Sequence, residues 1–112
     1  VLEESGYTPK QLQLLQPKLR IHHLSDVDLH PVPLVILTHK FSEGHFHSDS
    51  AWAFITSEAP RHKVAQTESA DIRFLTRQQI VDLPESQITE DVREIAQFIF
   101  DNLHEWDRVA TF

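Results

Sequence analysis

The 112-residue sequence contains no cysteine and no methionine. The absence of cysteine excludes disulfide bonds, zinc sites built from thiolates and a cysteine nucleophile. No apolar run approaches the roughly 20 residues that a membrane-spanning helix needs, and no cleavable signal segment is visible. We therefore expect no membrane partner and a cytoplasmic location.

Clusters of basic residues are also missing. The chain has 10 Lys and Arg against 17 Asp and Glu, a net charge of -7 at pH 7, and its basic residues are scattered. Because a protein that binds duplex nucleic acid presents a basic stripe to the phosphates, we do not expect such a partner. There is no repeat, low-complexity tract or linker, and the 40% hydrophobic content is that of an ordinary globular protein. Residues 1–112 are expected to form a single domain.

The first third of the chain predicts one short helix and two strands. Thr8-Pro9-Lys10-Gln11 has the residues of a capping box with proline at the first helical position, which predicts a two-turn helix before Pro17. Alternating apolar and polar residues then predict strands near 19–24 and 27–30.

The middle of the chain predicts strands separated by turns. The apolar run 34–37 is compatible with a buried strand or with a loop packed on the core, and Ser42-Glu43-Gly44 predicts a turn. Residues 51–56 are aromatic and β-branched, which predicts a central strand. Residues 71–75 alternate polar with apolar side chains, which predicts a further strand.

Two helices are expected in the last third. Thr76 is the N-cap residue expected for a short helix over 77–82, which should end before Pro84. Thr89 is the N-cap candidate of a longer helix over 89–104. The apolar stripe of this helix consists of Val92, Ile95, Ile99 and Leu103. Such a stripe is typical of a helix that packs on a sheet.

Two adjacent glutamates stand near the start of the chain. If residues 1–5 are helical, a carboxylate one position before Val1 would lie on the same helical face as Glu3 and Glu4, at positions i, i+3 and i+4 respectively. Carboxylates gathered in this way favour a hard divalent cation such as Mg²⁺ or Mn²⁺. The alternative is that both glutamates are solvated residues of a helix that ends at Gly6 as its C-cap.

A resemblance bears on this choice. The stretch V-L-E-E-S-G-Y at residues 1–7 is similar to the end of the Nudix hydrolase signature G-x5-E-x7-R-E-U-x-E-E-x-G-U, where U is a bulky aliphatic residue. The blocks "DLHPVP", "HFHSDSAWAF" and "ESADIRFLT" follow in the order expected of that family, and a long C-terminal helix comes after them. The sequence departs from the pattern at Tyr7, where an aliphatic residue is usual, and at Phe74, where Trp is common.

The resemblance implies a partial Nudix α/β/α sandwich of α/β class, with a mixed sheet, a C-terminal helix packed on it, and the end of the Nudix helix at 1–6. It implies a pyrophosphohydrolase that depends on Mg²⁺ or Mn²⁺ and acts on a nucleoside diphosphate linked to another group. Glu3 and Glu4 match the metal ligands, and Glu4 and Glu68 the catalytic residues, with Asp71 as a substitute for Glu68.

The resemblance also implies that the chain starts inside the Nudix box. A metal ligand then lies before Val1, so the full-length parent is expected to be the enzyme and this chain alone to be inactive. The missing strands would leave sheet edges unpaired. We therefore expect a marginally stable chain, a homodimer formed through a sheet edge, or a chain held by the missing segment.

A histidine-rich stretch in the middle of the chain offers other interpretations. In an extended segment, alternate residues share one face, and under the resemblance four residues are expected to line the substrate site: His45, His47, Asp49 and Trp52. The first three could instead bind Zn²⁺ or Fe²⁺ in a small cupin-like protein, with His39 or His30 as a further ligand. A catalytically inactive Nudix-like interaction domain is the third hypothesis.

Overall fold

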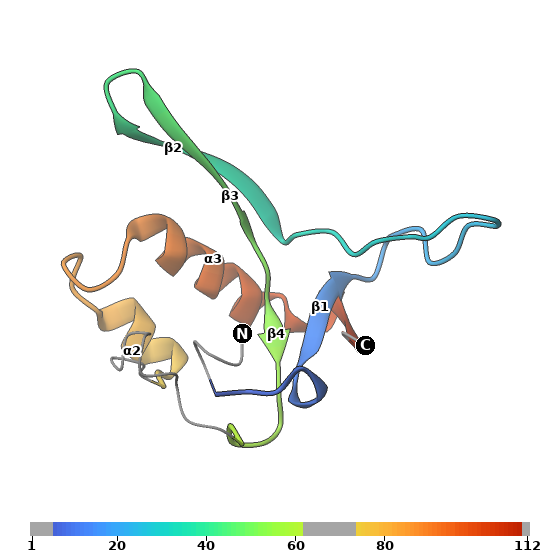
Figure 1. Cartoon of the computed structure of the whole chain (residues 1–112). Coiled ribbons are helices and arrows are strands. Elements are labelled where there is room, and N and C mark those ends of the chain that lie inside the picture. The colour runs from blue at the N-terminus through green and yellow to red at the C-terminus, as the bar shows by residue number, and fades with distance from the viewer. Residues whose placement is uncertain (1–5, 62–73, 111–112) are drawn as a thin grey trace.

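The computed structural model describes residues 6–61 and 74–110. Three strands form an antiparallel sheet in the order β4-β1-β5: β4 (Phe54–Ile55), β1 (Gln13–Pro17) and β5 (Trp106–Ala110). Figure 1 shows these strands side by side. Leu14 and Leu15 of the central strand point to opposite faces, and both are buried. This sheet is therefore covered on both faces at its centre.

The predicted helix after Thr8 is wrong beyond its first turn. The segment forms only the 3-10 turn η1 (Pro9–Gln11), after which the chain extends into β1. Leu14 pairs with Phe54 on one side and Val109 on the other. Pairing along both edges satisfies more backbone groups and buries more apolar surface than a second helical turn would, which is why the strand replaces the helix.

A hairpin forms the second sheet. Strands β2 (Val35–Ser42) and β3 (His45–Ala51) pair through the predicted turn, in which Gly44 has a φ of 75°. The apolar run 34–37 becomes the start of β2, where Ile36 faces solvent. Figure 1 shows the hairpin extending away from the three-stranded sheet. The described residues contain no strand at 19–24 or 27–30, where the chain forms an exposed loop.

The predicted strand at 51–56 is interrupted. Ala51 ends β3, and β4 is only two residues long and lies at an edge rather than at the centre. The break has a clear cause in the backbone hydrogen bonds, because Leu34 N donates to Ala51 O and Leu15 N donates to Ala53 O. The chain thus leaves the hairpin and joins the other sheet within two residues. Of the strand expected at 71–75, only Phe74 and Leu75 are described, and they are unpaired with any strand.

Both helices form where they were expected to begin. Helix α2 (Arg77–Asp82) has the predicted bounds, and its N-cap Thr76 forms a capping box with Gln79. Helix α3 (Glu90–Asp101) is shorter than the predicted 89–104. After Asn102 the chain makes the 3-10 turn η2 (Leu103–Glu105) and enters β5, which was not predicted.

Helix α3 connects the parts of the fold. The Phe98 ring contacts Trp106 of β5 edge to face, with ring centroids 6.0 Å apart. Arg93 is buried and donates to three carbonyl oxygens at the end of α2, those of Ile80, Val81 and Leu83. The last carbonyls of a helix lack the usual i+4 partners, and here Ile80 O accepts from the C-cap Leu83 N at 3.4 Å as well as from Arg93. The bonds from Arg93 therefore connect α2 to α3. The predicted apolar stripe is only half covered, because Val92 is 50% exposed.

The apolar core of the described residues is small. It consists of Leu12, Leu14, Leu15 and Ala53. Large apolar side chains are exposed elsewhere, with Ile36, Phe41 and Phe74 each 72% exposed. The radius of gyration is 16.1 Å, against roughly 13 Å for a compact domain of about this length. The described residues combine helices with sheets, which is consistent with the expected α/β class, and both of their sheets are antiparallel. None of the described helices is both long enough and apolar enough to span a bilayer.

Candidate functional site

Three of the expected site residues, Glu3, Glu4 and Glu68, lie outside the described residues. The described chain starts at Gly6, which is buried and has a φ of 81°. This left-handed conformation is one that glycine adopts without strain, whereas a residue with a Cβ does not. The glycine of the stretch V-L-E-E-S-G-Y is therefore required by the backbone.

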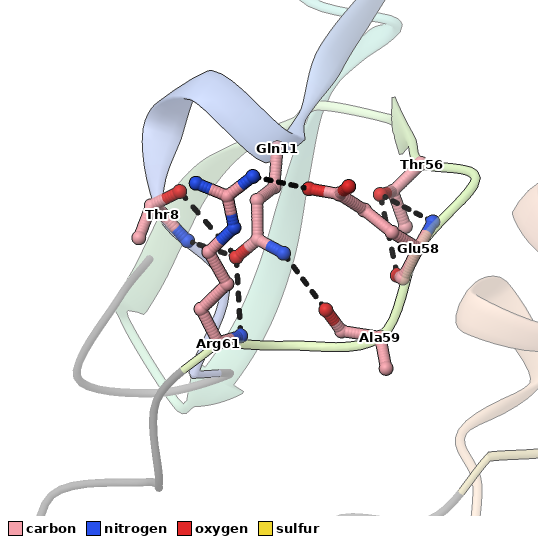
Figure 2. Close-up of polar contacts among 6 residues, drawn as sticks. All are labelled: Thr8, Gln11, Thr56, Glu58, Ala59 and Arg61. Atoms are coloured by element: carbon pink, nitrogen blue, oxygen red, sulfur yellow. Dashed lines mark hydrogen bonds and ion pairs between the residues drawn. The ribbon is translucent and has the colours of Figure 1, made fainter.

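The Gln11 side chain connects two distant segments of the chain. Its Oε1 accepts hydrogen bonds from Thr8 N at 3.0 Å and from Arg61 N at 3.2 Å, and its Nε2 donates to Ala59 O at 2.7 Å. Figure 2 shows the amide between these two segments. Gln11 is itself only 6% exposed. One buried amide thus holds the chain that follows Glu4 beside the chain that precedes Glu68.

A cavity of about 470 Å³ lies next to this amide. Its wall combines apolar residues with polar ones and includes two cations, Lys10 and Arg61, and one carboxylate, Glu58. Arg61 Nη2 lies 3.4 Å from Glu58 Oε1, and both side chains are about half exposed. The Thr56 hydroxyl accepts from Glu58 N at 3.3 Å, which holds the loop that carries the carboxylate (Figure 2). Among the described residues of its wall, the cavity therefore has one more positive than negative side chain.

The histidine-rich stretch occupies β3 of the hairpin. The strand alternation puts His45, His47 and Asp49 on one face, as expected. His47 stacks on Phe41, with ring centroids 4.7 Å apart. Asp49 Oδ2 lies 3.1 Å from His39 Nε2. All three predicted residues are exposed, and none lines the 470 Å³ cavity.

His39 is the residue through which this face meets α3. Besides Asp49, its Nε2 lies 3.9 Å from Asp91 Oδ2 in the first turn of the helix. The pKa of Asp91 lies below its usual value, mainly because the Thr89 hydroxyl donates a hydrogen bond to the carboxylate, with a smaller contribution from His39. A carboxylate kept ionised here attracts His39 when the imidazole is protonated.

The described residues contain no group of three or more histidine and acidic side chains that could hold a metal ion. His30 lies in the exposed loop between β1 and β2, away from the hairpin strands. The five described strands also fall short of the about eight of a jelly roll. Trp52 is 42% exposed, and its Nε1 donates to Ser50 Oγ at 3.2 Å.

Sequence analysis alone missed the residues that shape the cavity. Gln11 was expected only as the N3 residue of a capping box, and its carboxamide indeed accepts from Thr8 N. Its bonds to residues 59 and 61 have no local signal, because they join positions about 50 residues apart. For the same reason, the sequence did not indicate that Lys10 and Arg61 would line one cavity.

Comparison with protein-family models, with curated proteins and with solved structures finds no match for this chain.

Proposed function

We propose that this chain belongs to a Nudix-type pyrophosphohydrolase that depends on a divalent cation and acts on a nucleoside diphosphate linked to another group. The observation that carries the proposal is the Gln11 amide, which accepts from both Thr8 N and Arg61 N. In the proposed enzyme, Glu3 and Glu4 precede the first of these contacts and Glu68 follows the second. One buried side chain thus joins residue 8, four positions after Glu4, to residue 61, seven positions before Glu68.

Two further observations support the proposal. The left-handed, buried Gly6 fits the glycine that closes the Nudix motif. The 470 Å³ cavity beside Gln11 has the size of a small-molecule site, for which about 300–1,000 Å³ is usual. Its excess of positive charge suits a ligand that carries phosphates.

In this mechanism, Glu3 and Glu4 supply carboxylate oxygens, the donors that Mg²⁺ and Mn²⁺ prefer. The bound cation would neutralise charge on the phosphates and favour hydroxide at neutral pH. Glu68 would accept the proton of the attacking water as general base. Gln11 would keep the segments that carry these carboxylates side by side.

The test is hydrolysis by the protein expressed from the complete reading frame that contains this sequence. A panel of nucleoside diphosphate derivatives is incubated with and without Mg²⁺, and the nucleoside monophosphate released is separated and quantified. We expect hydrolysis that requires Mg²⁺ and falls by about two orders of magnitude or more in Glu4→Gln, because a ligand of the cation is lost.

The matched control is Glu43→Gln, which changes the same charge at the exposed tip of the hairpin, where Glu43 pairs with Lys40. This variant should hydrolyse the panel at the original rate. Hydrolysis that persists without a divalent cation, or that Glu4→Gln leaves unchanged, would contradict the proposal.

A second candidate is a Nudix-like interaction domain without activity. It is favoured by the apolar side chains on the outer face of the hairpin, where Ile36 is 72% and Phe46 is 63% exposed. Exposed apolar surface of this kind is typical of surfaces that bind other proteins. A folded, complete protein that hydrolyses no member of the panel would favour this candidate.

A further inference from the structure

The 470 Å³ cavity beside η1 is formed by parts of the chain that are far apart in sequence. Its wall includes Lys10 from η1, Arg61 and Glu58 from the loop after β4, and Ala110 at the end of β5. Apolar atoms come from Leu12 and Ile55. A cavity with apolar walls and a few polar or charged groups is the usual form of a small-molecule site.

The two cations differ in what they contact. Lys10 is exposed and makes no ion pair within the described parts of the chain. Arg61 is paired with Glu58, but the 3.4 Å distance is longer than the about 2.7–2.9 Å of a strong charge-assisted bond. Exposed pairs of this kind are weak. A ligand with more negative charge than one carboxylate can therefore take the Arg61 guanidinium from Glu58.

The Gln11 side chain holds together the two backbone segments that carry these cations. Its amide binds Arg61 through the backbone nitrogen, not through the guanidinium, and binds Ala59 O in the same loop. The Arg61 side chain is therefore free to change partner without loss of the link between the two segments. Such a preformed backbone lowers the cost of ordering a site around a ligand.

We propose that this cavity binds the phosphates of a small ligand through Lys10 and Arg61, and that Glu58 competes with the ligand for Arg61. A diphosphate is the expected group, a choice of ligand that rests on the proposed function. A long polyanion such as RNA is disfavoured, because the chain carries a net charge of -7 and would repel phosphates beyond the cavity.

The test is binding without catalysis. Titration calorimetry with the protein expressed from the complete reading frame, in EDTA so that no divalent cation takes part, uses inorganic pyrophosphate, ADP and adenosine as probes. We expect pyrophosphate and ADP to bind, adenosine to bind at least about tenfold more weakly, and the affinity for both anions to fall as salt is added.

Substitutions at the site should move the affinity in opposite directions. Lys10→Gln and Arg61→Gln should each weaken pyrophosphate binding about tenfold, whereas Glu58→Gln should strengthen it about threefold, because Arg61 loses its competitor. Lys40→Gln is the matched control, since it removes the same charge at the hairpin tip, where Lys40 pairs with Glu43. It should change the affinity less than twofold.

Circular dichroism establishes that each variant folds. Lys10 is exposed and makes no ion pair in the described residues, so Lys10→Gln keeps the test decisive even if Arg61→Gln lowers stability. Pyrophosphate that fails to bind, or that binds the Lys10 and Arg61 variants as tightly as the original chain, would overturn the inference.

This result can be separated from the outcome for hydrolysis. Binding that depends on Lys10 and Arg61 supports the inference even if the complete protein hydrolyses nothing. Hydrolysis with a KM that is unchanged in Lys10→Gln and Arg61→Gln would overturn the inference and leave the proposed function standing.

Discussion

Replacing Gln11 with leucine should separate the two segments that this side chain joins. Leucine has nearly the same size but removes the bonds to Thr8 N, Arg61 N and Ala59 O, which are 3.0, 3.2 and 2.7 Å long. At about 1 kcal/mol for each hydrogen bond, the loss would reach about 3 kcal/mol. Because these contacts are only partly buried, water will replace some of them. We therefore expect the free energy of unfolding to fall by about 2 kcal/mol.

Urea unfolding followed by circular dichroism measures this loss. For a small protein, a decrease of about 2 kcal/mol lowers the midpoint by about 1 M. Gln11→Glu keeps an acceptor for Thr8 N and Arg61 N but puts a carboxylate oxygen against Ala59 O and buries a charge, so it should cost at least as much as Gln11→Leu. Gln78→Leu is the matched control on an exposed face of α2, where the change should stay within about 0.5 kcal/mol.

The ranking of the three variants decides the outcome. If Gln11→Leu is no more destabilising than Gln78→Leu, the buried amide does not hold the segments together. The link between residue 8 and residues 59 and 61, on which the proposed function rests, would then fail as well.

Three further predictions concern the helices and the hairpin. Arg93→Met should destabilise the protein by about 3 kcal/mol and speed hydrogen exchange in α2, because three carbonyls lose a buried donor. Arg77→Met is the control, because Arg77 forms an exposed ion pair with Asp101, and it should cost no more than about 1 kcal/mol. Equal exchange rates in the two variants would refute this reasoning. Thr89→Val should raise the pKa of Asp91 toward its usual 3.8 in an NMR titration. Because the pKa is lowered in the folded state, the ionised carboxylate stabilises the fold above pH 3.8, and this contribution is lost as the pH falls through the folded pKa; an unchanged pKa in Thr89→Val would exclude the hydroxyl as its cause. Gly44→Ala should destabilise the hairpin by about 1 kcal/mol, because φ is 75° there, although no atom obstructs the added methyl group. The NMR chemical shifts of β2 and β3 should therefore change at a lower temperature in this variant than in the original chain, and shifts that stay unchanged on warming would contradict the prediction.

Local features of the sequence predicted local features of the fold. The N-cap Thr76 and the later Pro84 predicted the bounds of α2, and Ser42-Glu43-Gly44 predicted the turn of the hairpin. Thr89 predicted the start of α3. Each of these outcomes depends on residues within a few positions of one another, so the pattern along the chain contains the information that is needed.

Strand identity was harder to predict. Residues 13–16 were expected to be helical, yet residues 13–17 form the central strand because residues 54–55 and 106–110 pair with them from either side. Residues 106–110 were not expected to form a strand at all. Their conformation follows from pairing with β1, about 90 positions earlier in the chain, and no local pattern reports such a partner.

For the candidate site, too, the sequence predicted some features and the tertiary structure decided others. The sequence indicated Glu3, Glu4 and Glu68 through a resemblance, and these assignments stay predictions because the residues lie outside the described chain. The alternate spacing of His45, His47 and Asp49 predicted that they share a face of one strand, which they do. That they face His39 and Phe41 rather than the cavity depends on the register of the hairpin.

By itself, the sequence of this protein determined the two capped helices, the glycine turn and the net negative charge, because these depend on neighbouring residues or on composition. The tertiary structure alone decided that Gln11 joins residues 8 and 61, that Lys10 and Arg61 share a cavity, and that Arg93 fastens α2 to α3. The physical reason is that a polar side chain takes whichever partners folding brings within about 3 Å of it. Which partners these are depends on how distant strands and helices pack.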